Sequence, residues 1–190
     1  MFSKSELRRQ LRRARQQIPR ETRQRAELAT SRALKPLIKR GKKIAVYAPI
    51  GSEMRLDHFI RTAQKRGAHI YLPYITPKNL RLWFTPIDGK LERTRGAGSL
   101  NIPQYSGKKI RAHHLNVMIL PVVGVDKRAY RLGQGGGFYD TTLAANYSVL
   151  QPRKVAVGFA CQLVDELPSE THDCQVDDFA CELGILSFKK

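Results

Sequence analysis

The stretch RLGQGGGFYD at residues 131–140 contains the residue types in this chain that are best suited to chemistry. Its four glycines are Gly133, Gly135, Gly136 and Gly137, more than a turn between a strand and a helix needs. A glycine-rich loop in that position lets backbone N–H groups approach phosphate oxygens, and the following helix N-terminus adds positive potential. No Gly-Lys-Ser/Thr follows, so the stretch is not a Walker A motif. We interpret it as a phosphate-binding loop rather than a flexible turn alone.

Charged side chains stand at both ends of this loop. Arg131 opens it and can supply the fixed cation that phosphoryl transfer needs, whereas Lys127 and Arg128 are interpreted as a solvated basic turn. Asp140 ends the loop and is a candidate ligand for a magnesium ion that bridges phosphates. An aspartate in a first helical turn also suits the helix dipole, so a purely local role stays open.

Aromatic and acidic residues that could contact a substrate lie in the loop and beyond it. Phe138 and Tyr139 can stack on a flat heterocycle or anchor a helix, and one of each is expected because neighbouring helical residues point in different directions. Glu53 follows the first predicted strand, where it can accept hydrogen bonds from a heterocyclic substrate or cap the next helix. His172 and Asp173 fall in a polar turn without a recognisable nucleophile, which leaves a second metal ligand or a surface turn.

An alternation of predicted helices and strands positions these residues. A capping box at Ser3–Glu6 and an apolar stripe at helical spacing predict a basic helix that Pro19 ends. Further helices are predicted up to Gly41, before Gly67 and from about Phe138 to Asn146. Strands are predicted for KKIAVYAPI (42–50), HIYLPYI (69–75), LRLWFTPI (80–87), VMILPVVGV (117–125) and KVAVGFA (154–160), with a long polar loop over 92–109.

This order predicts an α/β fold, a single three-layer α/β/α Rossmann-like domain over residues 1–190, with a mostly parallel central sheet and an N-terminal basic helical segment. The almost continuously apolar run VMILPVVGV is typical of a central parallel strand that is buried on both faces. Ligands of such folds bind beyond the carboxyl ends of the strands, so we expect the glycine loop and Glu53 to share one edge.

The net charge of +18 is the strongest feature of the composition. Residues 1–43 contain fifteen Lys or Arg and three acids, which places +12 in the first quarter of the chain. Nucleic acid, a polyanionic metabolite or solubility alone can account for this charge. The three cysteines form no Cys-x-x-Cys pair, and we find neither a membrane-spanning run nor a signal peptide, so we expect a cytoplasmic protein.

The segment VDKRAYRLGQGGGFYD closely resembles the signature of the 5-formyltetrahydrofolate cyclo-ligase family, also called methenyltetrahydrofolate synthetases. Other landmarks of the family follow in order along nearly the whole chain: K-x-x-L-R at Lys4–Arg8, a glutamate at Glu53, NIPQ at 101–104 and L-P-x-E-x-H-D at Leu167–Asp173. The resemblance implies an enzyme that uses ATP and Mg²⁺ to convert 5-formyltetrahydrofolate into 5,10-methenyltetrahydrofolate. We expect a monomer that binds these small-molecule substrates and neither a membrane nor nucleic acid.

The resemblance also implies roles for individual residues. ATP would contact Lys4, Ser5, Glu6, Leu7, Arg8, Arg131, Leu132, Gly133, Gln134, Gly135, Gly136, Gly137, Phe138 and Tyr139. The folate would border Ala48, Glu53, Gln134, Gly135, Gly136, Gly137 and Phe138. Asp140 and Asp173 would hold magnesium, and Arg131 and Lys4 would take part in catalysis.

The chain departs from the family's pattern at three places. Gly136 stands where some relatives have a lysine, so a cation there must come from elsewhere or be dispensable. Phe138 replaces a common tyrosine, and Ala129-Tyr130 replaces a spacer that often holds glycine. Two other interpretations stay open: a catalytically idle relative that binds folate, and a basic nucleic-acid-binding protein, which would leave the glycine loop unexplained.

Overall fold

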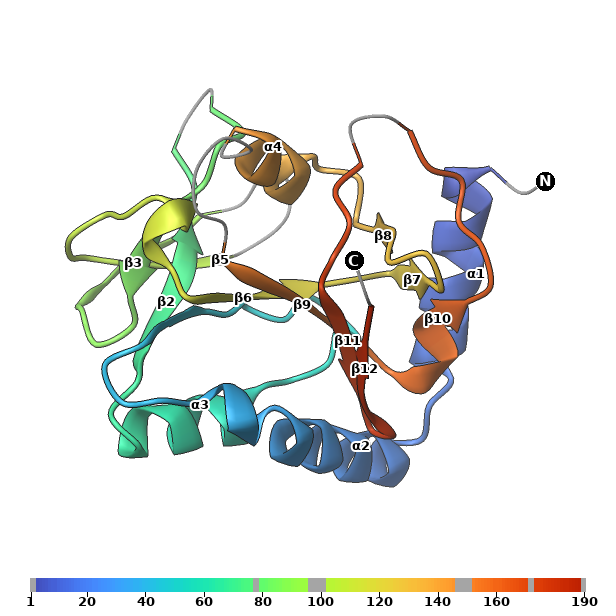
Figure 1. Cartoon of the computed structure of the whole chain (residues 1–190), viewed down its shortest axis with the longest axis horizontal. Helices are drawn as coiled ribbons and strands as arrows, with labels where there is room; N and C mark the ends of the chain where they lie inside the picture. Colours follow the sequence, from blue (N-terminus) through green and yellow to red (C-terminus); the bar gives the residue numbers. More distant parts are fainter. Residues whose placement is uncertain (1–2, 77–78, 96–101, 146–151, 171–172, 189–190) are drawn as a thin grey trace.

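A seven-stranded sheet forms the centre of the structure (Figure 1). Its spatial order is β12 (Gly184–Ser187), β11 (Asp178–Cys181), β9 (Arg153–Val157), β6 (Val117–Pro121), β1 (Lys43–Ala45), β2 (His69–Tyr74) and β3 (Trp83–Pro86). The five inner strands are parallel, and β12 and β3 are antiparallel to their neighbours at the edges. The computed structural model describes residues 3–76, 79–95, 102–145, 152–170 and 173–188. The predicted mostly parallel sheet is confirmed.

Helices cover both faces of this sheet. α2 (Arg20–Ala33) and α3 (Asp57–Lys65) lie on one face, α4 (Phe138–Ala144) lies on the other, and α1 (Lys4–Gln16) stands at one side (Figure 1). The predicted capping box starts α1, because Ser3 Oγ accepts from Glu6 N at 3.2 Å while the Glu6 carboxylate accepts from Ser3 N at 2.8 Å. The three-layer arrangement agrees with the predicted fold class.

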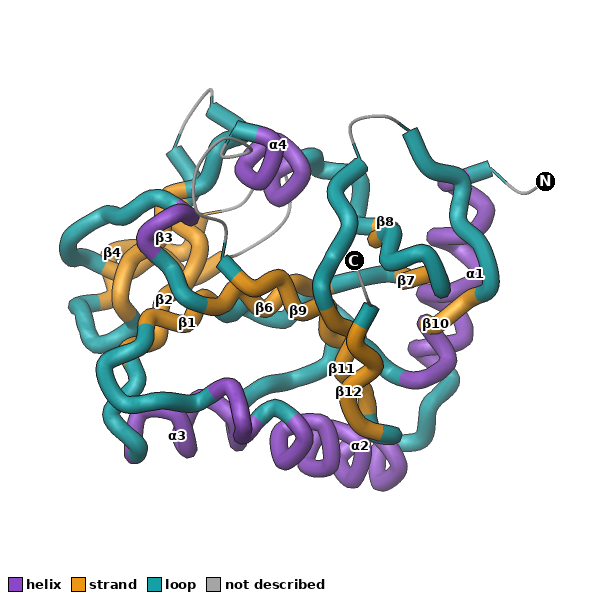
Figure 2. Tube along the Cα trace, in the orientation of Figure 1, coloured by secondary structure: helices purple, strands orange, loops and turns teal. Residues whose placement is uncertain are grey.

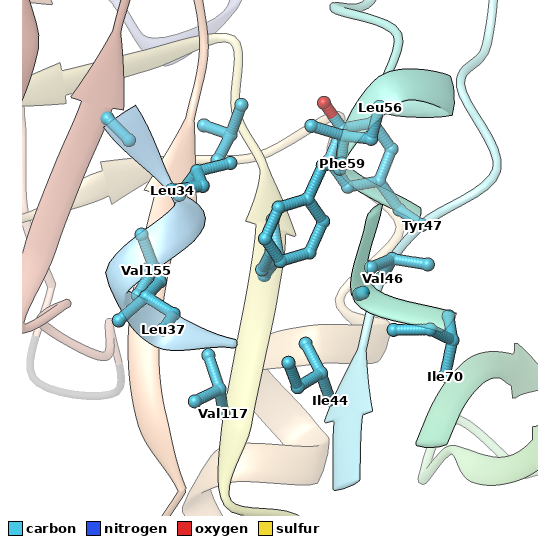
Figure 3. Close-up of a cluster of buried hydrophobic side chains, with 14 of the residues drawn as sticks. Leu34, Leu37, Ile44, Val46, Tyr47, Leu56, Phe59, Ile70, Val117 and Val155 are labelled. Carbon is cyan, nitrogen blue, oxygen red and sulfur yellow. The ribbon is translucent and has the colours of Figure 1, made fainter. Parts of the chain in front are cut away.

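Strand β6 is buried on both faces of the sheet. Val117 and Ile119 belong to the apolar cluster that Phe59 of α3 joins, and Figure 3 shows Val117 and Phe59 in that cluster. Met118 and Leu120 belong to a second cluster on the opposite face. Successive side chains of a strand point to opposite faces, so a strand covered on both faces must be apolar throughout. The predicted central strand is therefore confirmed.

The same apolar run does not continue as one strand. After β6 the chain enters a separate three-stranded sheet in the order β10 (Leu163–Val164), β7 (Gly124–Asp126), β8 (Arg131–Leu132). The side-chain amide of Gln162 donates to Val122 O at 2.7 Å and to Val123 O at 3.0 Å. These carbonyls are therefore satisfied outside the main sheet, which ends the ladder at Pro121. The small sheet lies beside α1 (Figure 2) and carries the start of the glycine loop.

Three other elements differ from the sequence predictions. α2 ends at Ala33 rather than near Gly41, because Pro36 in the 3-10 helix η1 (Lys35–Leu37) has no N–H to continue the hydrogen bonds of the α-helix. The predicted polar loop contains a hairpin of β4 (Leu91–Arg95) and β5 (Ile102–Tyr105), and residues 96–101 lie outside the described residues. The β11–β12 hairpin has no counterpart among the predicted strands.

Two more 3-10 helices are η2 (Ala112–His114) and η3 (Ala160–Gln162). Asn146, the last residue of the helix predicted from Phe138, is not among the described residues.

Candidate functional site

The candidate site lies at the carboxyl ends of β1 and β6. The parallel strands follow the order β2-β1-β6-β9-β11, so the connections that leave β1 and β6 turn to opposite faces of the sheet. Such a reversal of strand order leaves a crevice in which ligands of α/β proteins bind. A cavity of about 340 Å³ lies here, lined by the segment after β1, the glycine loop and the start of α4. The expected shared edge is confirmed.

Most of the predicted site residues line this cavity. They are Ala48, Glu53, Arg131, Gly133, Gln134, Gly135, Gly136, Gly137, Phe138, Tyr139 and Asp140. Leu132 is buried in a separate apolar cluster with Leu11 and Leu167. The predicted residues at the start of α1 and Asp173 are not among the described residues that line the cavity.

A hydrogen bond between Glu53 and Gln134 joins two loops across the cavity: the segment that follows β1 (residues 46–53, the β1 loop) and the glycine loop (residues 131–140). Gln134 Nε2 donates a 2.7 Å hydrogen bond to Glu53 Oε1, and the backbone N–H of Ile50 donates to Glu53 Oε2 at 2.9 Å. Only 4% of Glu53 is exposed, so these donors replace water around a buried carboxylate. Glu53 does not cap the next helix, α3, which has no side-chain hydrogen bond at its N-cap. Its carboxylate accepts hydrogen bonds from Ile50 N and Gln134 Nε2 instead.

Arg131 lies almost fully buried under the glycine loop. Its Nη2 donates a 2.6 Å hydrogen bond to Asp140 Oδ1, and its guanidinium carbon lies 5.6 Å from the centre of the Tyr139 ring. Nε of Arg131 is buried and has no hydrogen-bond partner among the described residues. A cation held beside the cavity with an unused donor is suited to an anionic ligand.

The glycines shape the loop around this arginine. A Cβ built on Gly133 would stand 2.7 Å from Arg131 Nη1, so only glycine leaves room for the guanidinium. Gly137, which precedes α4, has a φ of 69°, a conformation that side chains with a Cβ rarely adopt. Gly135 also has a positive φ, of 99°, so close approach and left-handed backbone account for three of the four glycines without reference to any ligand.

One face of α1 is cationic and turns toward the glycine loop. Arg8 Nε donates to Gly133 O at 2.8 Å, and Arg12 Nη2 donates to Gln134 Oε1 at 2.6 Å. Arg8 and Arg12 are four residues apart, a spacing that puts both side chains on one face of a helix. Lys4 is one further turn away on the same face. The sequence prediction named Lys4 and Arg8 but missed Arg12, and this regular spacing is the signal that could have found it.

The N-terminal end of α1 is tied to the segment around Asp173. Lys4 Nζ lies 2.8 Å from Asp173 Oδ2 and 2.9 Å from Glu170 Oε1. Burial works against the charge of Lys4, but the two carboxylates outweigh it and raise its pKa. Ser5 is exposed, Glu6 serves the capping box and Leu7 packs against the cluster of Leu11. His172 lies outside the described residues.

Arg15 is a second arginine that sequence reasoning missed. It is 3% exposed, and it donates to Ser52 Oγ at 3.0 Å and to Val122 O at 3.3 Å. Burial lowers the pKa of Arg15, and the nearby charge of Glu53 partly offsets this effect. Arg23 supports the same loop by donating to Ser52 O at 2.8 Å. No pattern in the sequence marks Arg15, since it lies beside the apolar stripe of α1.

The basic turn before the glycine loop points elsewhere. Lys127 pairs with Asp165 at 2.6 Å, and Arg128 pairs with buried Asp126 at 3.0 Å and with Glu166 at 2.9 Å. Neither residue is among those that line the cavity. Both residues are exposed, which agrees with the solvated basic turn predicted from the sequence.

Comparison with known proteins identifies the family. The sequence model of the 5-formyltetrahydrofolate cyclo-ligase family matches residues 1–182. The chain belongs to this family of enzymes. The 5-formyltetrahydrofolate cyclo-ligase of Mycolicibacterium smegmatis is 29% identical over 175 residues, which cover 90% of this chain and 89% of that protein. The Escherichia coli cyclo-ligase is 29% identical over 149 residues, covering 77% and 81%.

Structure comparison agrees with this assignment. The 5,10-methenyltetrahydrofolate synthetase of Aquifex aeolicus superimposes with a TM-score of 0.81 at 26% identity, covering all of this chain and 94% of that one. The predicted family and the prediction of an enzyme are confirmed, and the ligase and folate classes follow from the family. A search of the described residues finds no helix that is long and apolar enough to cross a membrane.

Proposed function

We propose that this cyclo-ligase family member converts 5-formyltetrahydrofolate into 5,10-methenyltetrahydrofolate with ATP and Mg²⁺, releasing ADP and phosphate. The observation that carries the proposal is the cavity in which the Glu53–Gln134 hydrogen bond joins the β1 loop to the glycine loop. A carboxylate and aromatic rings on the wall of one cavity suit a flat heterocycle with N–H groups. Buried Arg131 beside the backbone of the glycine loop suits a phosphate in the same space.

The reaction proceeds in two steps in this proposal. The formyl oxygen of the substrate attacks the γ-phosphorus of ATP, the bond from that phosphorus to the bridging oxygen breaks, and ADP leaves. N10 then attacks the formyl carbon and loses its proton, and the carbon–oxygen bond breaks to release phosphate. An amide-like oxygen leaves poorly until it is phosphorylated, so ATP supplies the leaving group. The protein contributes positioning and charge neutralisation, as in other phosphoryl transfers.

The basic residues take the phosphates in this proposal. Arg131 binds the transferred phosphoryl group through donors not committed to Asp140, and its burial strengthens that interaction. Lys4 and Arg8 come from the face of α1 that contacts the loop, and bind the remaining phosphates. Lys4 forms ion pairs with Asp173 and Glu170. It therefore either keeps these pairs while it contacts the nucleotide or breaks them to bind it.

The carboxylates fit magnesium only as partial ligands. No group of three or more His, Cys, Asp or Glu in the described part of the chain could hold a metal ion by itself. Magnesium in nucleotide enzymes is often held by one or two carboxylates together with phosphates and water, which Asp140 at the cavity wall can satisfy. Its Oδ1 accepts a hydrogen bond from Arg131, and its carboxylate would help hold the ion. The ion would neutralise phosphate charge when bound.

The test is direct. Purified protein with 5-formyltetrahydrofolate, ATP and MgCl₂ is expected to develop the ultraviolet absorbance of the methenyl product and to release ADP in equal amount. Omission of ATP is the control. A folded protein that binds the folate calorimetrically but forms neither product would be an idle binder, and the proposed activity would be wrong.

A further inference from the structure

Gln134 connects a cation on α1 to the buried carboxylate of the cavity. Arg12 donates to Gln134 Oε1 from Nη2 at 2.6 Å and from Nε at 3.0 Å, and Nη2 also reaches the backbone oxygen of Gln134 at 3.3 Å. On the other side, Gln134 Nε2 donates to Glu53 Oε1 at 2.7 Å. The chain of contacts Arg12–Gln134–Glu53 brings together α1, the glycine loop and the β1 loop.

The charges at the two ends permit one orientation of the amide. A guanidinium only donates hydrogen bonds and an ionised carboxylate only accepts them. Gln134 therefore has to turn its oxygen to Arg12 and its nitrogen to Glu53, as observed. The reverse orientation would place donor against donor and acceptor against acceptor. Arg12 and Glu53 thus select the same orientation of the Gln134 amide, and Arg12 holds it from the side of α1.

Glu53 needs this support because it is buried. Its two oxygens each accept one hydrogen bond, from Gln134 and from the backbone of Ile50, which fixes the plane of the carboxylate. An ionised carboxylate offers about four acceptor positions, so roughly two stay available for a ligand in the cavity. A substrate with adjacent N–H donors would bind best if these positions were held in one direction before it arrives.

We propose that Arg12 and Gln134 are positioning residues that orient Glu53 toward the N–H groups of the folate, with Arg12 acting only through Gln134. This inference rests on the proposed function for the identity of the substrate. It assigns Arg12 to folate binding, although its charge and its place on α1 beside Arg8 would otherwise favour a role in ATP binding.

The inference is tested by a double-mutant cycle with two readouts. The dissociation constant for 5-formyltetrahydrofolate is measured by calorimetry without ATP, and the KM for ATP is measured by turnover, in Arg12→Ala, Gln134→Met and the double variant. Loss of one hydrogen bond to a charged group predicts that each single variant weakens folate binding about tenfold. Because Arg12 acts through Gln134, the double variant is expected to be no weaker than Gln134→Met alone. In Arg12→Ala the KM for ATP should stay the same. The Gln134 variants are compared by folate binding alone, because the family resemblance also places Gln134 near ATP.

Two further variants separate positioning from folding and from charge. Gln134→Glu keeps an acceptor for Arg12 but sets a carboxylate against Glu53, so it should weaken folate binding more than Gln134→Met does. Arg13→Ala removes an exposed cation from the neighbouring position of α1 and should change neither constant, which controls for charge and helix propensity. The melting temperature of every variant confirms that it is folded.

The outcomes distinguish this inference from the proposed activity. Multiplicative effects in the double variant, or a raised KM for ATP with unchanged folate binding in Arg12→Ala, would overturn the positioning role while the wild-type protein still forms product. A wild-type protein that binds folate without turnover would overturn the activity, and the cycle of dissociation constants would still decide the role of Arg12. A wild-type protein that binds no folate would overturn both.

Discussion

Arg131 and Asp140, the first and last residues of RLGQGGGFYD, are joined by a hydrogen bond of 2.6 Å from Nη2 to Oδ1. The side chain of Arg131 is 3% exposed and that of Asp140 is 26% exposed, so the pair connects the protein interior to the cavity wall. One ion pair therefore joins the two ends of the glycine loop. This pair restrains a backbone whose glycines would otherwise allow many conformations.

Arg131→Ala should abolish most of the turnover. Removing a preorganised cation from a water-excluded site lowers kcat by about 10²–10³-fold in comparable enzymes. The variant also leaves Asp140 without its partner, and because Asp140 is partly exposed we expect a loss of about 2 kcal/mol of unfolding free energy. Steady-state kinetics and urea denaturation measure the two effects. Lys127→Ala, which breaks the exposed pair with Asp165, is the matched control, and unchanged kinetics in Arg131→Ala would remove Arg131 from the phosphate site.

Gly133→Ala should lower turnover, whereas Gly41→Ala should lower stability and leave turnover intact. The new Cβ at Gly133 would approach Arg131 Nη1 at 2.7 Å and displace the guanidinium, so kcat should fall at least tenfold. The melting temperature should fall by no more than in Arg131→Ala, because the same pair with Asp140 is disturbed. Gly41 has a φ of 74° and open space around it, so its substitution should cost about 1 kcal/mol of stability and leave turnover intact. Equal activity of both variants would show that the position of Arg131 does not matter.

Asp140→Asn should raise the magnesium requirement. The amide oxygen can still accept from Arg131 Nη2, but the neutral side chain loses the charge that attracts a divalent cation. Magnesium titration of the initial rate is expected to show a several-fold higher half-saturating concentration. The melting temperature should fall modestly, because buried Arg131 loses its counter-charge. Asp165→Asn serves as the control for a surface carboxylate. An identical magnesium titration in Asp140→Asn would contradict the assigned role.

Acid should destabilise the fold through Asp178. Burial alone would raise the pKa of Asp178, but hydrogen bonds from Arg153 and Ser187 and the charge of Arg153 outweigh it and lower the pKa below the ordinary value of 3.8. A carboxyl with a lowered pKa stabilises the protein above its unfolded pKa, and this contribution is lost as the pH falls through the folded value. Melting temperature should therefore fall as the pH drops below about 4, with a shallower slope in Asp178→Asn. Glu21→Gln, in an exposed helical pair, should retain the wild-type slope.

Local patterns predicted much of the fold. The capping box of α1, the continuous apolar run of β6 and the helix that begins at Phe138 depend on residues close together in the chain, so their signals survive without tertiary context. The split between β6 and β7 could not be predicted this way. It depends on Gln162, which is 40 residues from the Val122 oxygen that it binds.

The features of the candidate site also divide into those visible in the sequence and those that depend on tertiary contacts. The sequence by itself determined the glycine loop, its flanking Arg131 and Asp140, and the helical spacing of the basic residues on α1, because these are properties of composition and short-range order. Only the tertiary structure decided that Arg12 reaches Gln134, 122 residues away, and that Gln134 in turn reaches Glu53. Such contacts arise from the packing of α1 and two loops around the sheet edge, and packing between distant segments leaves no period in the sequence.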